Sequence, residues 1–549
     1  MKSPLIEIRD LHLSFTNGTA ETEILHGVDL NLQRGEILGV IGESGSGKTM
    51  TGMALLRLLP DNARVRAGKM DFDGSALPPL TETEFNGLRG IRLAMIFQDP
   101  SGSFNPAKRI FWHFRQILNR SRLKSTSRYP DSSRTRETAL QLMRDVGIKR
   151  AEEVLDLYPH QLSGGMLQRV LIALVLALEP DLIVADEPTT NLDKIVERQI
   201  LDLFLDLRSR LDAGIIFVTH DMGVAASLCD RIAVMRYGEV LETGPARQIF
   251  EDPQHEYTQL LISTAREISD APVKAAPAAD LPPAPALFSL ENIDLTFPAS
   301  GARPPFKALQ SVSLDIREGE ILGLVGESGS GKTTLGRTLL RLYEPSAGRL
   351  TYRGQDITHI SERAMRPMRR ELQMVFQDPG SSFNPRYTMG RSMADALRMA
   401  GGPKDRIRER ITGLFTRVGL TEAHADRFPH ELSGGQLQRV GIARAVALDP
   451  RLIVADEAVS KLDVSVRSGV LRLFREIQRE KQLSMVFITH DLEVARFMCD
   501  RIAILYHGKL LEIGPTARIF DAPGHEYTKA LLSTLDYGLG GAKFGERAV

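Results

Sequence analysis

The chain has 549 residues, which is too long for a single hydrophobic core, so we expect at least two domains. Its 42% hydrophobic and 25% charged residues are typical of a soluble globular protein, and 69 basic residues balance 69 acidic ones. This balance argues against a global charge bias toward nucleic acid or anionic membranes. The only cysteines, Cys229 and Cys499, exclude a disulfide framework, a cysteine zinc site or a four-cysteine iron–sulfur cluster.

Apolar runs are short throughout the chain. The run at 170–178, where we expect a buried helix, is among the longest and falls well short of the 18 or so residues that a membrane-spanning helix needs. The first residues carry no long apolar segment, so we expect no secretory signal. We therefore expect a cytosolic protein, or one that reaches a membrane only through a partner.

The first strand is predicted at 6–15, where apolar and polar residues alternate, and a matching pattern recurs at 288–297. Each is followed by an apolar run, 37–41 or 321–325, that leads directly into G-x-x-x-x-G-K-[ST]. A buried strand before this motif and a helix after it, which we expect at 49–59 and 333–342, are the context of a phosphate-binding loop. Glycines let successive backbone N–H groups face phosphate oxygens, and the helix N-terminus adds positive potential.

We therefore predict two nucleotide-binding loops. Lys48 and Lys332 are expected to bridge the β- and γ-phosphates of a nucleotide, while Thr49 and Thr333 offer hydroxyls to Mg²⁺. The predicted phosphate-binding residues are Gly42, Ser44, Gly45, Ser46, Gly47, Lys48 and Thr49 in the first loop, and Gly326, Ser328, Gly329, Ser330, Gly331, Lys332 and Thr333 in the second.

Landmarks recur at a nearly constant offset, which settles at 270 residues from Ser163 and Ser433 onward. This period indicates two copies of one domain rather than a solenoid of short repeats. We place the domains at 4–265 and 288–549, the second with a C-terminal extension. Residues 266–287, rich in proline and alanine, are predicted to form a semi-rigid linker.

Carboxylates follow a buried strand in each copy. Asp186 and Glu187 end one run, and Asp456 and Glu457 end the other. Parallel sheets bind ligands at this edge, so the aspartates are expected to hold Mg²⁺ and the glutamates to accept a proton from the attacking water. Further candidates are Gln98 and Gln377, which can orient water or metal, and His220 and His490, which can donate to the γ-phosphate.

The regular alternation of strands and helices predicts an α/β core with a parallel sheet in each copy. With Leu-Ser-Gly-Gly at 162–165 and 432–435, the sequence resembles the nucleotide-binding domains of ABC transporters along nearly its whole length outside the linker. The resemblance implies tandem phosphate-loop NTPase domains, each with an antiparallel β subdomain and a helical subdomain. It also places Phe15 and Phe297 where that family stacks an aromatic ring on adenine, although a core phenylalanine fits these positions nearly as well.

In that family two domains pair head to tail, so each ATP lies between the phosphate loop of one copy and the Leu-Ser-Gly-Gly turn of the other. The resemblance therefore implies a first site that joins the Lys48 loop to Ser433, Gly434 and Gly435. The second site would join the Lys332 loop to Ser163, Gly164 and Gly165. Both sites have all their parts, so we predict two competent ATPase sites.

Several motifs resemble the importer ATPases for dipeptides, oligopeptides, nickel and glutathione. These are Phe-Asn-Pro at 104–106 and 383–385 and His-Glu-Tyr-Thr at 255–258 and 525–528. The latter is also explained by a surface helix cap. Most such importers use separate Gly-Gly-Met and Gly-Gly-Gln chains, whereas this chain fuses both, as in tandem peptide and glutathione import ATPases.

Three residues depart from the family pattern in the loops after the glutamates: Asn191, Lys461 and Ala458. Because these loops face each other across the implied dimer, Asn191 and Lys461 are hypothesised to alter coupling between the sites. Restoring alanine at both positions should then change cooperativity in ATP.

The leading hypothesis is an ATP-hydrolysing subunit of a bacterial importer, docked on two transmembrane permease subunits and served by an extracytoplasmic solute-binding protein. The alternative is a soluble tandem ABC ATPase that acts on ribosomes or nucleic acid. The short, nearly uncharged linker and the zero net charge favour the first, and no nucleic-acid partner is expected. A regulatory ATPase without a transport partner is a third possibility. The sequence does not identify the cargo.

Overall fold

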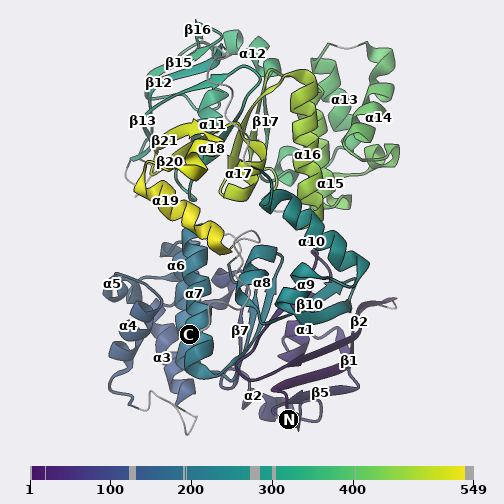
Figure 1. The fold of residues 1–549 in the computed structure, drawn as a ribbon, viewed down its shortest axis with the longest axis vertical. Coiled ribbons are helices and arrows are strands. Elements are labelled where there is room, and N and C mark those ends of the chain that lie inside the picture. Colours follow the sequence, from purple (N-terminus) through teal and green to yellow (C-terminus); the bar gives the residue numbers. More distant parts are fainter. Residues whose placement is uncertain are drawn as a thin grey trace. The chain divides into compact units, whose positions relative to one another are not determined.

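The computed structural model describes residues 3–18, 20–122, 131–189, 192, 194–272, 285–299, 305–401, 403–460 and 462–537. Contacts divide the chain into two compact units (Figure 1). Unit 1 comprises Met1–Ser263 with Asp536–Val549, and unit 2 comprises Thr264–Leu535.

The antiparallel sheet of unit 1 has the strand order β2-β1-β5-β6, with β4 also paired to β1. Its first strand buries alternate residues but shifts register between Ile8 and Leu11, where Asp10 adopts a left-handed backbone. A β-bulge therefore interrupts the predicted alternation. The strands are β1 (Ile6–Asn17), β2 (Ala20–Leu32), β4 (Ala63–Arg66), β5 (Lys69–Phe72) and β6 (Ser75–Ala76).

The core sheet of unit 1 has the order β11-β10-β3-β9-β8-β7, and only the edge strand β11 runs antiparallel to its neighbour. The three central strands are buried along their whole length, as expected for a parallel sheet that is covered on both faces. The strands are β3 (Ile37–Ile41), β7 (Leu93–Ile96), β8 (Leu182–Asp186), β9 (Gly214–Thr219), β10 (Arg231–Arg236) and β11 (Glu239–Pro245).

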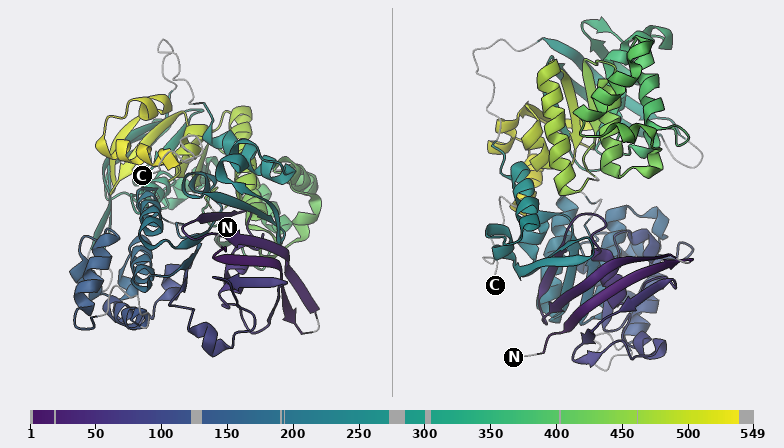
Figure 2. Two further views of the ribbon diagram at one scale, coloured as in Figure 1. Left: turned by 60° about the horizontal axis from the view of Figure 1, so that its bottom comes forward. Right: turned by 90° about the vertical axis from the view of Figure 1, so that its right-hand side faces the viewer.

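The helices of unit 1 fall into two groups, and Figure 2 shows the helical group (blue) apart from the antiparallel strands (purple). The helical group contains α3 (Ile110–Ser121), α4 (Thr135–Asp145), α5 (Ala151–Leu155) and α6 (Gly164–Leu178). The others are α1 (Lys48–Leu55), α2 (Glu82–Asn86), α7 (Lys194–Leu211), α8 (Met222–Leu228), α9 (Ala246–Glu251) and α10 (Glu256–Ser269), which continues into unit 2 from Thr264 onward. Two short 3₁₀ turns, η1 (Pro100–Ser103) and η2 (Pro159–Gln161), complete the unit.

Unit 2 repeats this architecture, with sheet orders β13-β12-β15-β16 and β17-β18-β19-β14-β20-β21. Its strands are β12 (Ala286–Phe297), β13 (Phe306–Arg317), β14 (Ile321–Val325), β15 (Ala347–Tyr352), β16 (Gln355–Asp356), β17 (Leu372–Val375), β18 (Leu452–Asp456), β19 (Ser484–Thr489), β20 (Arg501–Tyr506) and β21 (Lys509–Pro515). Its helices are α11 (Lys332–Leu339), α12 (Glu362–Glu371), α13 (Met389–Met399), α14 (Ile407–Arg417), α15 (Gly434–Val446), α16 (Val464–Lys481), α17 (Leu492–Met498), α18 (Thr516–Asp521) and α19 (Glu526–Leu532). Its 3₁₀ turns are η3 (Gly380–Ser382), η4 (Lys404–Arg406), η5 (Glu422–Asp426), η6 (Pro429–Glu431) and η7 (Ser533–Tyr537).

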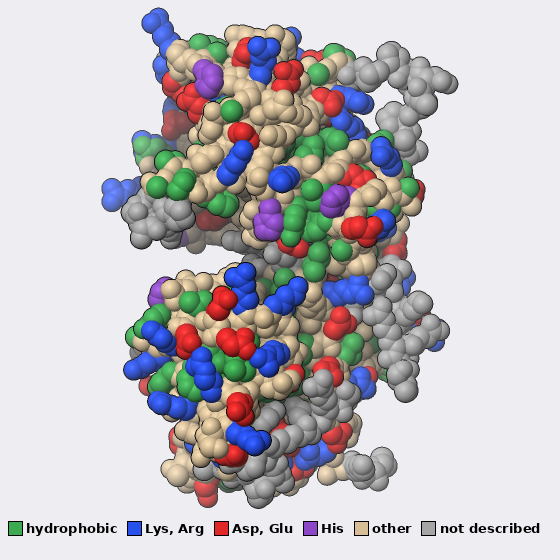
Figure 3. All heavy atoms as spheres, turned by 90° about the vertical axis from the view of Figure 1, so that its left-hand side faces the viewer, with side chains coloured by type: hydrophobic (Ala, Val, Ile, Leu, Met, Phe, Trp, Pro, Cys, Tyr) green, Lys and Arg blue, Asp and Glu red, His purple; other side chains and the backbone are tan. Residues whose placement is uncertain are grey.

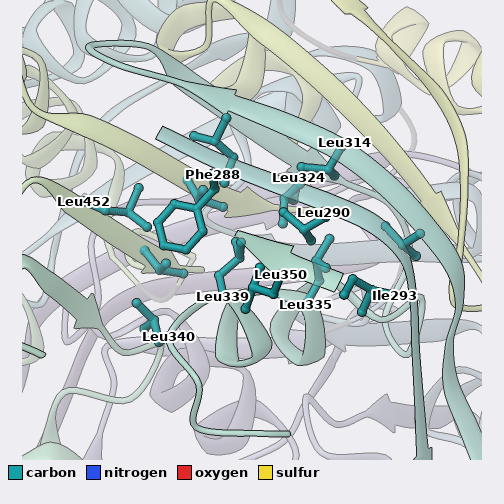
Figure 4. Close-up of a cluster of buried hydrophobic side chains, with 14 of the residues drawn as sticks. Phe288, Leu290, Ile293, Leu314, Leu324, Leu335, Leu339, Leu340, Leu350 and Leu452 are labelled. Carbon is teal, nitrogen blue, oxygen red and sulfur yellow. The ribbon is translucent and has the colours of Figure 1, made fainter. Parts of the chain in front are cut away.

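The core of unit 2 joins its two sheets to the helix after the phosphate loop. Figure 4 shows Phe288 and Leu290 of β12, Leu324 of β14 and Leu335 and Leu339 of α11 converging in one buried cluster. An equivalent cluster in unit 1 joins β1, β3 and α1. Burial of this kind contributes about 1.5–3 kcal/mol per large side chain, so the phosphate loop is anchored at both ends by core residues.

Three differences from the predicted elements have local causes. Helix α1 was predicted to reach Leu59 but ends at Leu55, because Arg57 adopts a left-handed backbone. Helix α6 starts at Gly164, six residues before the apolar run that predicted it. Helix α10 continues to Ser269, into the predicted linker, because Glu267 bonds to Ser468 (2.6 Å) and pairs with Arg472 (3.5 Å) within unit 2. Linker residues 273–284 lie outside the described residues.

The α/β fold class is confirmed, and both cysteines are buried and form no disulfide. Burial raises the pKa of Cys229 far above its usual range, which suits a packing role. Within the parts of the chain described above, none of the helices combines the length and apolarity that crossing a bilayer requires.

Candidate functional site

Each phosphate loop needs glycine where its backbone approaches a neighbouring strand. Gly42 has a φ of 154°, and a Cβ there would lie 2.2 Å from the Met235 carbonyl oxygen. Gly47 begins α1 in the left-handed region, with a φ of 100°. Gly326 and Gly331 repeat this geometry, with φ values of 154° and 102°. Any other residue would clash or strain the loop, so these glycines are structural requirements of its curl.

The lysine side chain of each phosphate loop folds back and hydrogen-bonds to backbone carbonyls of its own loop. Lys48 Nζ donates to the carbonyl oxygens of Gly42 and Glu43 at 2.8 Å each, and it lies 3.4 Å from the Ser46 hydroxyl. Lys332 makes the same bonds to Gly326 and Glu327 at 2.7 Å. Both lysines are buried, so each loop encloses a fixed positive charge. At the tips of the loops, Ser44, Gly45, Ser328 and Gly329 are exposed, whereas Ser46 and Ser330 are buried.

The predicted metal ligands meet in pairs. Thr49 Oγ1 donates to Asp186 Oδ1 at 2.8 Å, and Thr333 donates to Asp456 at the same distance. Burial raises the pKa of both aspartates, an effect that the adjacent glutamates reinforce and the threonine hydroxyls oppose. Hydroxyl and carboxylate oxygens are the ligands that Mg²⁺ prefers, so these pairs fit the ion chemically.

In each unit the glutamate proposed as the general base lies between the candidate glutamine and the candidate histidine. Glu187 Oε2 accepts from Gln98 Nε2 at 2.9 Å, and its Oε1 lies 3.0 Å from His220 Nδ1. Around Glu457 the matching distances are 2.6 Å to Gln377 Nε2 and 3.5 Å to His490 Nδ1. The sequence separations gave no indication of these contacts, which arise because the strand ends meet at one sheet edge.

Both glutamates have a left-handed backbone, with φ values of 45° and 44°. Their N–H groups nevertheless bond to the adjacent strand, at the carbonyls of Val218 and Ile488. The backbone turn thus directs the carboxylates toward the histidines while the strand keeps its ladder. A non-glycine residue in this region costs about 1–3 kcal/mol, and such strain clusters at functional sites.

Sequence reasoning missed the residues that fix the histidine loops. Asp221 follows His220 and caps α8 by accepting the Val224 N–H at 3.1 Å. Lys194 of α7 lies 3.4 Å from this carboxylate. In unit 2, Asp491 caps α17 and pairs instead with Arg467 at 3.6 Å. An aspartate directly after the histidine in both copies was the available signal.

The Leu-Ser-Gly-Gly turns begin the long helices of the helical groups. Ser163 caps α6 by accepting the Met166 N–H at 3.3 Å, and Ser433 caps α15 in a reciprocal box with Gln436. Gly165 and Gly435 pack against Val196 and Val466 of the following helices.

Gly164 and Gly434 are exposed, and a Cβ on either would meet open space. Packing within each unit therefore gives no reason for glycine there. A close approach by something outside the unit would give one.

The remaining candidates are less informative. Phe15 and Phe297 are partly buried against the cores of their units, and the Phe297 ring packs edge-on against Tyr343 at 5.3 Å. Adenine stacking at these rings stays a prediction. Asn191 and Lys461 lie outside the described residues, while Ala458 is buried.

Comparison with known families gives matches in both units. A model described as "ABC transporter" matches residues 25–190 and 309–460. A second, described as "Oligopeptide/dipeptide transporter, C-terminal region", matches 241–286 and 511–537.

Two relatives are the glutathione import ATP-binding proteins GsiA of Salmonella choleraesuis (39% identical) and Pectobacterium atrosepticum (40% identical). In both, the alignment covers 97% of this chain and 89% of the relative. Among solved structures, cbiO1 from Clostridium perfringens, part of the ABC transporter complex cbiONQ, is 25% identical. It covers 46% of this chain and 96% of its own, with a TM-score of 0.40.

Proposed function

The chain belongs to the ABC transporter family of ATP-binding subunits, and from this we infer that it is the ATP-hydrolysing subunit of a bacterial importer of the peptide, opine, nickel or glutathione type. Relatives that are import ATP-binding proteins along 97% of the chain support this reading over a soluble ATPase acting on ribosomes or nucleic acid. So does the C-terminal region match in both units. On the face shown in Figure 3, basic and acidic side chains are interspersed, which gives nucleic acid no single positive field.

The proposal that the chain hydrolyses ATP rests mainly on one observation: in each unit a glutamate carboxylate lies within contact distance of a glutamine and a histidine. In the first site Glu187 accepts the proton of the attacking water, Gln98 orients that water, and His220 donates to the γ-phosphate. Glu457, Gln377 and His490 do the same in the second site. The buried Lys48 and Lys332 supply positive charge to the β- and γ-phosphates.

Mg²⁺ is proposed at the Thr49–Asp186 and Thr333–Asp456 pairs, whose oxygens are already adjacent. When bound, the ion would neutralise phosphate charge. The buried aspartates keep an acceptor at the phosphate loop, while the glutamates beside them remain available as bases.

We further propose that each ATP is completed by the Leu-Ser-Gly-Gly turn of the other unit. The Lys48 loop would face Ser433, Gly434 and Gly435, and the Lys332 loop would face Ser163, Gly164 and Gly165. The open space above Gly164 and Gly434 supports this, since a helix N-terminus with an unobstructed backbone can contact phosphate. ATP binding would then close the pair, and hydrolysis would release it.

A membrane permease is the partner of an import ATP-binding subunit, so the chain is expected to be peripheral at the cytoplasmic face of the membrane. The finer composition, two permease subunits and an extracytoplasmic solute-binding protein, is part of the proposal. Co-purification from detergent-solubilised membranes with two polytopic proteins supports it. Recovery without any polytopic protein counts against a transport role.

The catalytic assignment is tested by replacing both glutamates, Glu187→Gln with Glu457→Gln. Each carboxamide keeps its size and its place in the backbone turn but cannot take a proton from water. ATP should still bind, and turnover should fall about 10²–10⁴-fold, the usual contribution of a general base. Phosphate release at the parent rate would refute the assignment, while loss of ATP binding would show that the glutamates serve binding instead.

A further inference from the structure

The His-Glu-Tyr-Thr segments begin the last helices of the two units, and their histidines act as helix caps. His255 Nδ1 accepts the Tyr257 N–H at 3.1 Å, and His525 does the same for Tyr527 at 3.0 Å. A glutamate on the preceding strand fixes each cap. Glu242 accepts the N–H groups of Gln254 and His255 at 2.9 and 3.0 Å, and Glu512 accepts those of Gly524 and His525 at 2.8 and 3.2 Å. The cap explains the histidine but leaves the tyrosine unexplained.

The tyrosine hydroxyls point at the phosphate loops. Tyr527 Oη accepts the backbone N–H of Glu327, the first variable residue of its loop, at 3.3 Å. Tyr257 is buried beside Glu43, the equivalent residue. Burial, followed by the Glu43 carboxylate, raises the pKa of Tyr257 to about 12, so this hydroxyl keeps its proton. No hydrogen bond of ordinary geometry among the described residues reaches the Tyr257 hydroxyl, so the contact is tighter in unit 2.

The two rings are held by different neighbours. Arg236 lies over the Tyr257 ring, 4.4 Å from its centroid, whereas Tyr506 packs against the Tyr527 ring at 4.5 Å. Different packing thus brings both hydroxyls to the same loop position. Ring packing alone would not require a hydroxyl in either unit.

The tyrosine and the loop lysine bind the same residue, Glu327, through different backbone groups. Lys332 Nζ donates to the Glu327 carbonyl, while Tyr527 accepts from the Glu327 N–H. To bridge two phosphates, this lysine has to exchange or share its carbonyl bonds. The tyrosine bond does not compete with phosphate, so it can hold the loop in its curled form throughout.

We propose that Tyr527 and Tyr257 are positioning residues of the two phosphate loops, holding the first variable residue so that the loop is pre-formed for the triphosphate. This rests on the proposed ATP sites at Lys48 and Lys332. It assigns the C-terminal segment a role in nucleotide affinity, through the connected series Glu512, His525, Tyr527 and Glu327.

The test isolates the second site in the full-length chain carrying Lys48→Ala, and compares it with the same chain carrying Tyr527→Phe as well. Phenylalanine keeps the ring and removes only the hydroxyl. The Kd for ATP with Mg²⁺, and the KM for hydrolysis where turnover persists, should rise about 2–10-fold, the usual net effect of one hydrogen bond. The unfolding temperature should fall by no more than about 2–4 °C, as expected for the loss of one hydrogen bond. Tyr257→Phe in a Lys332→Ala chain should give a smaller rise.

Tyr506→Phe is the matched control, since it removes a neighbouring hydroxyl from the ring that packs on Tyr527. An unchanged Kd in the Tyr527→Phe chain would overturn the proposal. So would an equal rise in the Tyr506→Phe chain, because that would indicate general loosening. Lys48→Ala combined with Lys332→Ala separates the two levels of inference: if that chain still binds ATP normally, the ATP sites themselves are wrong.

Discussion

At the scale of single residues, the buried aspartates oppose stability while they serve the site. Burial raises the pKa of Asp186 and Asp456, so the folded state binds a proton more tightly than the unfolded state does. Stability from this source is therefore present at low pH and is lost as the pH rises through the raised pKa. At neutral pH both carboxylates are expected to lower the free energy of unfolding.

Asp186→Asn with Asp456→Asn should consequently raise the unfolding temperature at pH 7–8 when chelator is present and nucleotide is absent. The asparagine oxygens can still accept the Thr49 and Thr333 hydroxyls. The gain should shrink as the pH falls toward the ordinary aspartate pKa of about 4, and it should be absent below it. Thermal unfolding between pH 4 and 8 checks this. Lower stability of the variant at neutral pH would contradict it.

Residue types at the site were predictable from sequence, but their contacts were not. The motifs gave Lys48, Asp186 and Glu187 because phosphate chemistry demands those groups next to strand ends. The bond from Gln98 to Glu187 depends on two strands far apart in the chain meeting in parallel. The motif that contains Tyr257 was noted, but the role of its hydroxyl was missed, since no pattern in the sequence shows which loop a buried hydroxyl faces.

At the scale of elements, the two Leu-Ser-Gly-Gly helices differ in how their starts are capped. Gln436 completes a reciprocal box with Ser433, whereas Met166 leaves Ser163 with a one-sided cap. The N-terminus of α6 in unit 1 is therefore less well capped than that of α15 in unit 2.

Met166→Gln should complete the missing box and raise the free energy of unfolding of unit 1 by about 0.3–1.5 kcal/mol. Chemical denaturation followed by fluorescence of Trp112, the only tryptophan, reports on this unit. Met166→Leu is the control, because it changes the side chain without adding an acceptor. Equal stability of the glutamine and leucine variants would show that the box does not form.

Elements with strong periodicity were predicted well, and their ends were not. The central strands matched their apolar runs because a buried parallel strand leaves little alternative. The bulge at Asp10 and the end of α1 at Leu55 each depend on one residue with a left-handed backbone. Neither residue is a glycine, so the sequence did not mark these positions. Helix α10 runs past the predicted domain boundary because tertiary contacts of Glu267 outweigh local composition.

At the scale of the whole molecule, the duplication gives two sites with the same parts. The carboxylates of Glu187 and Glu457 have equivalent neighbours, so these contacts give no reason to expect one candidate site to be degenerate. The family and the tandem fold were predictable because the motifs occur twice at a steady offset. The head-to-tail pairing of the two units came only from the family resemblance, and it stays a prediction.

Equivalence of the sites predicts that Glu187→Gln and Glu457→Gln, introduced singly, lower steady-state ATP turnover by similar factors. Independent sites would retain about half the rate, and coupled sites would retain less, as each closure would wait for both nucleotides. Phosphate release from the two single variants, measured beside the parent and the double variant, decides this. A parental rate in one of them would identify a site that does not turn over.

The left-handed backbone of Glu187 and Glu457 implies that each unit sacrifices some folding stability for ATP turnover. Glycine would occupy either position without strain, so selection for folding alone would favour it there. A screen for thermostability that does not measure turnover should therefore select glycine at these two positions. The selected proteins would be more stable but would not hydrolyse ATP.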